Sequence, residues 1–205
     1  MEISHRRLPH IHAVGRPLFV TFRLHGSLPA GREFPKASLT SGEAFVAMDR
    51  LLDTARFGPI HLKRPEVAEL VRGCIRHCAS ADSDMHARVI MPNHVHLLIT
   101  PHSNVSELLR RLKGYSARQA NRLLGRRGQP FWQDESYDHL VRNREESRRI
   151  ERYIINNPVN AGLAESADRF PVVQRGGGLT EAGLETHRRR GRPPHKAGHL
   201  HYIAH

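Results

Sequence analysis

Cysteine and long apolar runs are both scarce in this 205-residue sequence, and each scarcity excludes a class of protein. The two cysteines, Cys74 and Cys78, are too few for a disulfide framework or a four-cysteine zinc site. No stretch approaches the roughly 20 apolar residues that a membrane-spanning helix needs. The first residues also lack the apolar segment of a secretory signal. We therefore expect a cytoplasmic protein with no membrane partner.

Positive charge, by contrast, is abundant. The chain has 32 Lys and Arg residues against 20 Asp and Glu, a formal net charge of +12, and only four of these cations are lysines. The planar guanidinium group of arginine matches phosphate oxygens and stacks on bases. This composition favours a polyanionic partner, most simply nucleic acid. The alternative is an ordinary soluble surface in which arginine reflects codon preference.

The composition predicts one folded domain followed by a tail. Hydrophobic residues make up 39% and charged residues 25% of the chain, as in globular proteins. After Phe170 the apolar periodicity ends, and three consecutive glycines and an arginine-rich stretch follow. We assign residues 1–172 to the folded domain and residues 173–205 to a basic tail that we expect to be disordered.

Apolar periodicity predicts four strands and four helices in the folded domain. We expect strands over residues 18–25, 87–91, 94–100 and 131–141, and helices over 43–56, 66–78, 105–124 and 145–157. Asn104 or Ser106 is expected to cap the third helix, and Pro158 to stop the fourth. This order predicts an α+β fold of ferredoxin-like (RRM-like) type, an antiparallel sheet with helices on one face.

Two histidines in one predicted strand form the first candidate site. His94 and His96 are two positions apart, so their side chains point to the same face, and Val95 points to the other. Two imidazoles on one face can chelate a divalent cation. In a chain with 16 histidines, a pair of ordinary surface histidines is the alternative.

The second candidate site lies on the last predicted helix. Tyr153 and Asn157 are four residues apart, which places them on one helical face, one turn from each other. A phenol is a candidate nucleophile, and an amide oxygen is a hard ligand suited to Mg²⁺ or Mn²⁺. A tyrosine near a helix end can equally be a packing residue.

Three blocks resemble the REP-associated tyrosine transposases, relatives of the insertion-sequence-200-like HUH transposases. The blocks are residues 91–99 (MPNHVHLLI), 128–133 (GQPFWQ) and 153–163 (YIINNPVNAGL), and they occur in the order of that family. The first block is fairly specific, the third strengthens it, and the tail lies outside all three.

The resemblance implies a ferredoxin-like catalytic domain in which His94 and His96 hold a divalent metal, Mg²⁺ or Mn²⁺. It implies that Tyr153 is the nucleophile and that Asn157 completes the metal site, where some relatives have glutamine. The implied activity is metal-dependent cleavage and rejoining of single-stranded DNA at hairpins, such as repetitive extragenic palindromes, through a 5′-phosphotyrosine intermediate. A nucleoid association would follow from this activity.

Two other tyrosines compete for the nucleophile role. Tyr115 lies on the basic helix with Gln119 four residues later, which is the same spacing of phenol and amide. Tyr137 lies in the aromatic segment before the last helix. We rank Tyr153 first because the Asn-Pro-Val-Asn-Ala-Gly-Leu block follows it.

The third predicted helix and the turn after it supply the candidate DNA-binding residues. These are Arg110, Arg111, Lys113, Arg118, Arg122, Arg126, Arg127 and, for stacking on bases, Trp132. A solvated helix face and a core tryptophan are the alternatives.

A non-catalytic structured-DNA or RNA-binding protein, such as a domesticated transposase, and a metal-dependent hydrolase remain rival functions. The chain leaves open whether it acts as a monomer or a homodimer.

Overall fold

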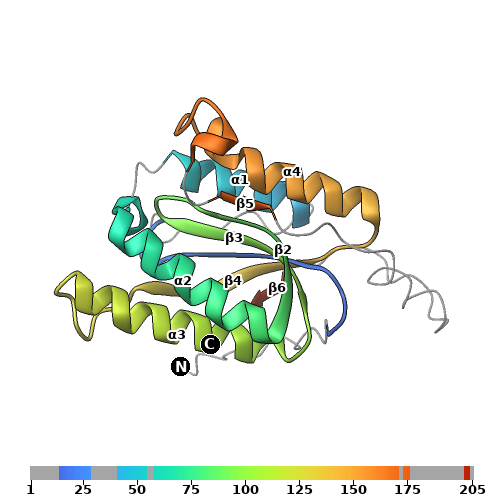
Figure 1. The fold of residues 1–205 in the computed structure, drawn as a ribbon. Helices are drawn as coiled ribbons and strands as arrows, with labels where there is room; N and C mark the ends of the chain where they lie inside the picture. The colour runs from blue at the N-terminus through green and yellow to red at the C-terminus, as the bar shows by residue number, and fades with distance from the viewer. Residues whose placement is uncertain (1–13, 29–40, 55–57, 171–172, 176–200, 204–205) are drawn as a thin grey trace, which may run out of the picture.

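The computed structural model describes residues 14–28, 41–54, 58–170, 173–175 and 201–203. Within these ranges an antiparallel sheet has the strand order β5-β2-β3-β1-β4-β6 (Figure 1). The elements are β1 (Leu18–Leu24), α1 (Ser41–Asp53), η1 (His61–Lys63), α2 (Pro65–Asp82), β2 (Ser83–Ile90), β3 (His94–Pro101), α3 (Val105–Leu123), β4 (Trp132–Leu140), α4 (Arg144–Asn160), η2 (Ala167–Arg169), β5 (Val173–Arg175) and β6 (His201–Ile203).

The four central strands confirm the predicted fold class. Strands β2 and β3 form an antiparallel pair, β1 pairs antiparallel with β3, and β4 pairs antiparallel with β1. Together with α2 and α3 they give the order strand, helix, strand, strand, helix, strand of a ferredoxin-like fold. Strand β2 begins before the predicted position, because a shift in register between Met85 and Ala87 interrupts the alternation on which the prediction depended.

Helices cover both faces of the sheet, not one face as predicted. In Figure 1, α2 and α3 lie on one side and α1 and α4 on the other. One buried cluster joins β-strand residues such as Val95 and Leu97 to α2 and α3, and a second joins Leu98 to Met48 of α1 and Ile154 of α4. Every residue of β3 is buried for this reason, since a strand presents alternate side chains to opposite layers.

Helix α4 continues past Pro158, contrary to the prediction that this proline stops it. The helix runs to Asn160 with Pro158 inside it. The cap residue is Ala161, and the next residue, Gly162, has φ +69°. The Gly162 N–H donates to the carbonyl of Val159 and the Leu163 N–H to that of Pro158. This is a Schellman end, and it depends on glycine because few other residues adopt a positive φ. Asn104 caps α3, one of the two predicted caps.

Two short segments of the predicted tail are strands. Val173–Arg175 pairs with β2 and His201–Ile203 pairs with β4, so these residues differ from the expected lack of regular structure. Pairing with the edge of an existing sheet requires no apolar periodicity, which explains why the sequence pattern did not indicate it. The rest of the 173–205 tail lies outside the described residues, and the domain boundary at residue 172 stays a prediction. No helix among the described residues is long and apolar enough to cross a membrane.

Candidate metal and nucleophile site

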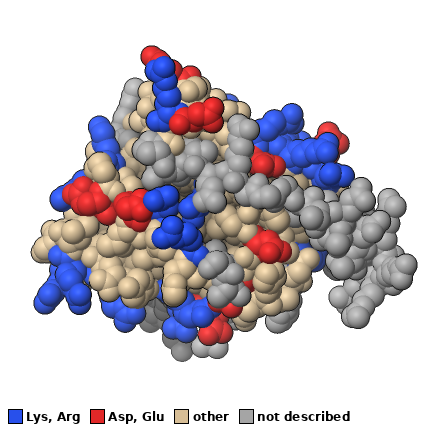
Figure 2. Space-filling view, viewed as in Figure 1, with Lys and Arg blue, Asp and Glu red and all other residues tan. Residues whose placement is uncertain are grey.

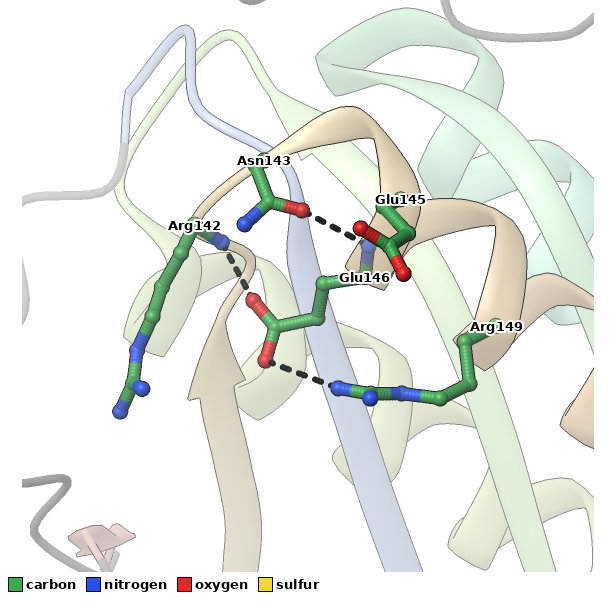
Figure 3. A pocket seen from close by; sticks show the side chains of 5 residues that line it. All are labelled: Arg142, Asn143, Glu145, Glu146 and Arg149. Carbon is green, nitrogen blue, oxygen red and sulfur yellow. Dashed lines mark hydrogen bonds and ion pairs between the residues drawn. The ribbon is translucent and has the colours of Figure 1, made fainter.

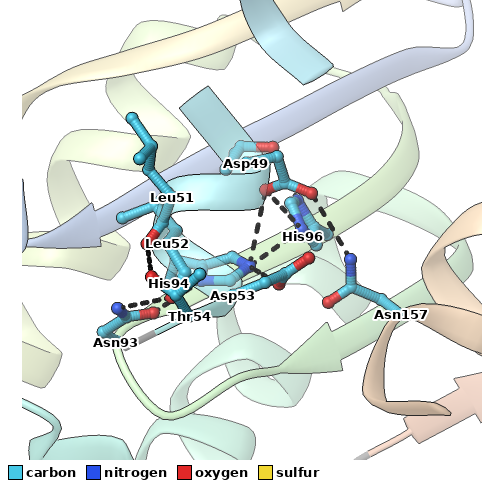
Figure 4. A network of polar contacts seen from close by, with 10 residues as sticks. Asp49, Leu51, Leu52, Asp53, Thr54, Asn93, His94, His96 and Asn157 are labelled. Atoms are coloured by element: carbon cyan, nitrogen blue, oxygen red, sulfur yellow. Dashed lines mark hydrogen bonds and ion pairs between the residues drawn. The ribbon is translucent and has the colours of Figure 1, made fainter. Parts of the chain in front are cut away.

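The two histidines of β3 face the layer that contains α1 and α4. Both side chains are completely buried, and their Nε2 atoms lie 3.0 Å apart (Figure 4). Strand alternation puts them on one face, and the short distance shows that both rings turn the same nitrogen toward one point. A pair of surface histidines, the alternative interpretation, is excluded by their burial.

Helix α1 adds a carboxylate that the sequence analysis missed. Asp49 is 2% exposed, and its Oδ1 atom lies 3.2 Å from His96 Nε2 and 3.6 Å from His94 Nε2. Asp49, His94 and His96 form the group of potential metal ligands found in the described part of the chain, with ligand atoms within 4.8 Å of one another. A signal was present in the sequence. Asp49 and Asp53 are four apart on one helical face, and two like charges at this spacing destabilise a helix unless something compensates them.

Asn93 fixes which nitrogen of His94 carries the proton. Its side-chain Nδ2 donates to the carbonyl of Leu52 at 2.9 Å, so its Oδ1 is the atom that faces His94 Nδ1, at 2.7 Å. That oxygen can only accept, so His94 Nδ1 must donate. The Nε2 atom of His94 therefore has a free lone pair, which is the form of imidazole that binds metals.

Thr21 of β1 makes the equivalent contact to His96. Its Oγ1 lies 2.7 Å from His96 Nδ1. A hydroxyl can donate or accept, so this contact permits either tautomer of His96. With His96 Nε2 protonated, it can donate to His94 Nε2. With Nδ1 protonated, both Nε2 lone pairs are available to a cation.

Burial and mutual contact shift the acid–base properties of these groups. Burial, and then the neighbouring His96, lower the pKa of His94 to about 3, so its ring is neutral at neutral pH. Burial alone would raise the pKa of Asp49, but contacts with His96, His94 and Asn157 outweigh it and hold the pKa below its usual value. Burial, and then the charge of Asp49, raise the pKa of Asp53 to about 7.

Three buried oxygen atoms at this site fit a bound cation. Asp49 Oδ1, Asp53 Oδ1 and Asn157 Oδ1 are all inaccessible to solvent. Asp53 Oδ1 and Asn157 Oδ1 have no hydrogen-bond partner, and Asp49 Oδ1 faces only the two histidine Nε2 atoms. An unpaired buried acceptor is costly. Asp53 Oδ1 also lies 3.9 Å from His94 Nε2. Two imidazole nitrogens with carboxylate and amide oxygens are a donor set suited to Mn²⁺ or Mg²⁺.

Asn157 reaches the site from α4, through a contact different from the one expected. Its Nδ2 donates to Asp49 Oδ2 at 3.4 Å, a long hydrogen bond, so the amide contacts the carboxylate that faces the histidines (Figure 4). Asn157 therefore supports Asp49 in this arrangement, and its Oδ1 is one of the unpaired buried oxygens.

Tyr153 lies beside the histidine pair within the same chain. Its ring centroid is 5.7 Å from that of His96 and 6.3 Å from that of Phe19, both in edge-on contact. The spacing of four on α4 brings Tyr153 and Asn157 to the same region, as the sequence predicted. The side chain is partly exposed, so a substrate has access to it.

The two competing tyrosines are placed differently. Tyr115 is 48% exposed on α3, which packs on the opposite face of the sheet from the histidines. Tyr137 packs on the same face as Tyr153 but is 4% exposed, in the apolar cluster around Phe19. Burial excludes Tyr137 from contact with a large substrate, and location separates Tyr115 from the group of potential metal ligands.

The candidate DNA-binding residues divide into exposed and buried groups. Arg110, Arg118, Arg122 and Arg127 are exposed, Arg111 pairs with Asp82, and Arg126 contacts His61 and Gln129. Lys113 is 7% exposed and donates to the Asp134 carbonyl at 2.8 Å, so its inclusion was wrong. Trp132 is also buried, with its Nε1 donating to Ser116 Oγ at 2.9 Å. It is a core residue and cannot stack on bases. The error at Lys113 came from treating α3 as exposed all round, and the error at Trp132 came from overlooking that β4 packs into the apolar cluster around Phe22.

Comparisons with known proteins agree with this fold. Residues 62–157, which include both histidines, Tyr153 and Asn157, match the family model described as "Transposase IS200 like". This confirms the resemblance stated from the three sequence blocks. No curated protein sequence matches the chain.

A solved structure shows the same fold. It is a REP-associated tyrosine transposase bound to a REP hairpin, with a TM-score of 0.54 and 19% sequence identity, covering 83% of this chain and 82% of that one. At this identity the likeness establishes the ferredoxin-like fold of the transposases for this chain. The roles of individual residues depend on the geometry described above.

Proposed function

We propose that the protein is a metal-dependent transposase that cleaves and rejoins single-stranded DNA at hairpins through a 5′-phosphotyrosine intermediate. The observation that carries the proposal is the placement of Tyr153 against His96, whose Nε2 converges with His94 Nε2 and Asp49 Oδ1. A phenol next to a buried metal-binding group is the arrangement that nucleophilic attack on a phosphodiester needs.

The chain's own residues account for binding and orientation. His94, His96 and Asp49 would hold the metal, with Asn157 supporting Asp49 and Asn93 holding the His94 ring. A bound Mg²⁺ or Mn²⁺ supplies charge stabilisation at the oxygens of the scissile phosphate. The apolar contacts of the Tyr153 ring with Phe19 hold the phenol in place for attack.

The reaction conserves the number of phosphoester bonds. The Tyr153 oxygen forms a bond to phosphorus and gives up its proton to solvent, the bond from phosphorus to the 3′ oxygen breaks, and that oxygen takes up a proton. Attack by another 3′-hydroxyl on the phosphotyrosine reverses these changes and joins two strands. No nucleotide cofactor is needed.

The site draws all its members from one chain, which supports activity in a monomer. We also propose that the DNA substrate contains a hairpin, by analogy with the DNA bound to the structural relative, and that the protein acts in the cytoplasm on nucleoid DNA. The exposed Arg110, Arg118, Arg122 and Arg127 are proposed contacts for the DNA backbone outside the cleavage site.

An end-labelled cleavage assay tests the proposal. Single-stranded DNA containing a hairpin is incubated with the protein and Mn²⁺ or Mg²⁺, then separated on a denaturing SDS gel. We expect a covalent protein–DNA adduct that carries a 3′-end label, and release of the 5′-labelled fragment with a free 3′-hydroxyl. Tyr153→Phe should abolish the adduct, because it removes the attacking oxygen and leaves the ring.

Matched substitutions of the other tyrosines serve as controls. Tyr115→Phe and Tyr137→Phe should each retain the adduct. An adduct that survives Tyr153→Phe would refute the assignment of the nucleophile. Cleavage without any adduct would indicate a hydrolase that uses activated water, and binding without cleavage would indicate a domesticated DNA-binding protein.

A further inference from the structure

We infer that the exposed arginines of α4, next to Tyr153, form the surface that binds the single-stranded DNA flanking the cleavage site. This inference rests on the proposed function, because it describes where the DNA strand runs once it leaves the Tyr153 hydroxyl. It assigns a DNA-binding role to Arg148, Arg149 and Arg152, which lie outside the α3 set expected from the sequence.

The position of α3 makes a second cationic surface necessary. The arginines of α3 lie on the face of the sheet opposite to the histidines, since α3 packs in one buried cluster and α4 in the other. A DNA strand held at Tyr153 has its nearest phosphates on the α1 and α4 side of the sheet. Cations that neutralise those phosphates must come from that side.

The helical neighbours of Tyr153 suit a polyanion. Residues three and four positions away on α4 are Arg149, Ile150, Asn156 and Asn157, which include one cation, two amides and no acid. Arg149 and Asn156 are exposed, as is Arg152 directly before the tyrosine. Four residues of α-helix rise about 6 Å, a distance that an arginine side chain spans. Arg149 therefore reaches a phosphate adjacent to the one at Tyr153.

Exposed cations gather along this part of the molecule. Figure 2 shows Lys and Arg side chains at the upper right of the view, over the N-terminal half of α4 in Figure 1. Arg148 and Arg152 are four apart on the helix, a like-charge pair that slightly destabilises a helix by itself. A bound phosphate chain offsets that repulsion.

Glu146, near the start of α4, does not neutralise this surface. Glu146 accepts from the Arg142 N–H at 2.7 Å and contacts His139 Nε2 at 3.0 Å, so both of its oxygens are engaged in the fold. Arg149 lies 3.8 Å from Glu146, at the outer limit of an ion pair, and its side chain is 72% exposed. Figure 3 shows Arg149 and Arg142 on either side of Glu146 in the pocket there. Such a long surface contact is easily exchanged for a phosphate.

The experiment compares two double variants that remove the same charge. Arg149→Ala with Arg152→Ala alters α4, and Arg72→Ala with Arg76→Ala alters α2 on the other side of the sheet. Binding of a short oligothymidylate and of a blunt DNA hairpin is measured by fluorescence anisotropy at several salt concentrations. Circular dichroism melting verifies that each variant is folded.

We expect the α4 variant to bind oligothymidylate on the order of tenfold more weakly near 0.1 M salt. Its slope of log affinity against log salt should be flatter by about 1.4, because each of two lost phosphate contacts on a single strand contributes about 0.7. The α2 variant should bind oligothymidylate like the wild type.

Equal losses in both variants would overturn the inference, since overall charge alone would then explain them. The inference would also be overturned if the α4 variant bound oligothymidylate like the wild type, or if it lost affinity only for the blunt hairpin. The adduct assay separates the two proposals. A wild-type protein that forms the adduct while the α4 variant binds normally refutes only the α4 surface, whereas a wild-type protein that forms no adduct refutes the proposed function.

Discussion

The two faces of the sheet differ in chemistry although the same strands build both. On the α2 and α3 side, β3 contributes Val95 and Leu97 to a large apolar cluster. On the α1 and α4 side it contributes His94 and His96, which meet Asp49 and lie near Tyr153. One strand therefore anchors the fold with its odd-numbered side chains and forms the candidate site with its even-numbered ones. The stable layer holds the reactive layer in place.

The largest expected effect is a loss of stability on the α3 side of the sheet, without a loss of metal binding. Trp132→Ala removes a ring that contacts Phe22 and Phe131 at centroid distances of 4.9 and 4.8 Å, and leaves Ser116 Oγ without its donor. The free energy of unfolding should fall by about 3–5 kcal/mol. Urea unfolding followed by circular dichroism measures this, since Trp132 is the only tryptophan and fluorescence is lost with it.

The comparison of the two faces would be wrong if this substitution also removed the effect of Mn²⁺ on melting. We expect the folded variant to bind Mn²⁺ like the wild type. Trp132→Phe should cost less, because it retains most of the apolar contact and loses the hydrogen bond to Ser116.

The next effect tests the α1 and α4 side. Asp49→Asn removes the anionic oxygen that faces both imidazoles, and the affinity for Mn²⁺ should fall by about 100-fold, a large effect for one donor. The rise in melting temperature caused by Mn²⁺ should shrink accordingly. A bound ligand stabilises the folded protein by an amount that grows with the logarithm of the ligand concentration divided by its Kd. Thermal melting with and without Mn²⁺ measures both.

Asp84→Asn is the matched control, since Asp84 is an exposed aspartate on β2, with a side chain 66% exposed. Its Mn²⁺-dependent shift should equal that of the wild type. An undiminished shift in Asp49→Asn would exclude Asp49 as a ligand and leave the two histidines with Asn157.

The smallest effect concerns pH and the buried Lys113 of α3. Burial lowers the pKa of this ammonium group to about 8, whereas in the unfolded chain it is about 10.4. Between these values the unfolded chain binds more protons than the folded one, so the stability conferred at this position rises as pH increases from 8 to 10. Below pH 8 the buried charge costs about 3 kcal/mol, since a difference of about 2.4 pKa units corresponds to that free energy.

Urea unfolding of the wild type and Lys113→Met at several pH values isolates this contribution, because other titrating groups cancel in the difference. The wild type should gain stability relative to Lys113→Met by about 2 kcal/mol between pH 7.5 and pH 10. A difference that does not change with pH would mean that the Lys113 ammonium group is solvated, and that the α3 side is less apolar than described.

Much of the fold was predictable because local periodicity reports which side chains share a face. The four central strands and the four helices were predicted within a few residues, and the alternation in β3 placed the two histidines together. The prediction that Pro158 stops α4 was wrong because the last turn of the helix tolerates this proline. The helix stops instead just before Gly162, which has a positive φ. The prediction of helices on one face failed because a fully buried strand carries apolar side chains on both faces, and its pattern does not say what covers them.

The sequence by itself determined that His94 and His96 point the same way and that Tyr153 and Asn157 lie one turn apart, since both relations follow from the repeat of a strand or a helix. Only the tertiary structure decided that Asp49, far away in the chain, faces those imidazoles, and that Lys113 and Trp132 turn inward. Contacts between distant segments depend on how the layers pack against each other, and no short-range pattern contains that information.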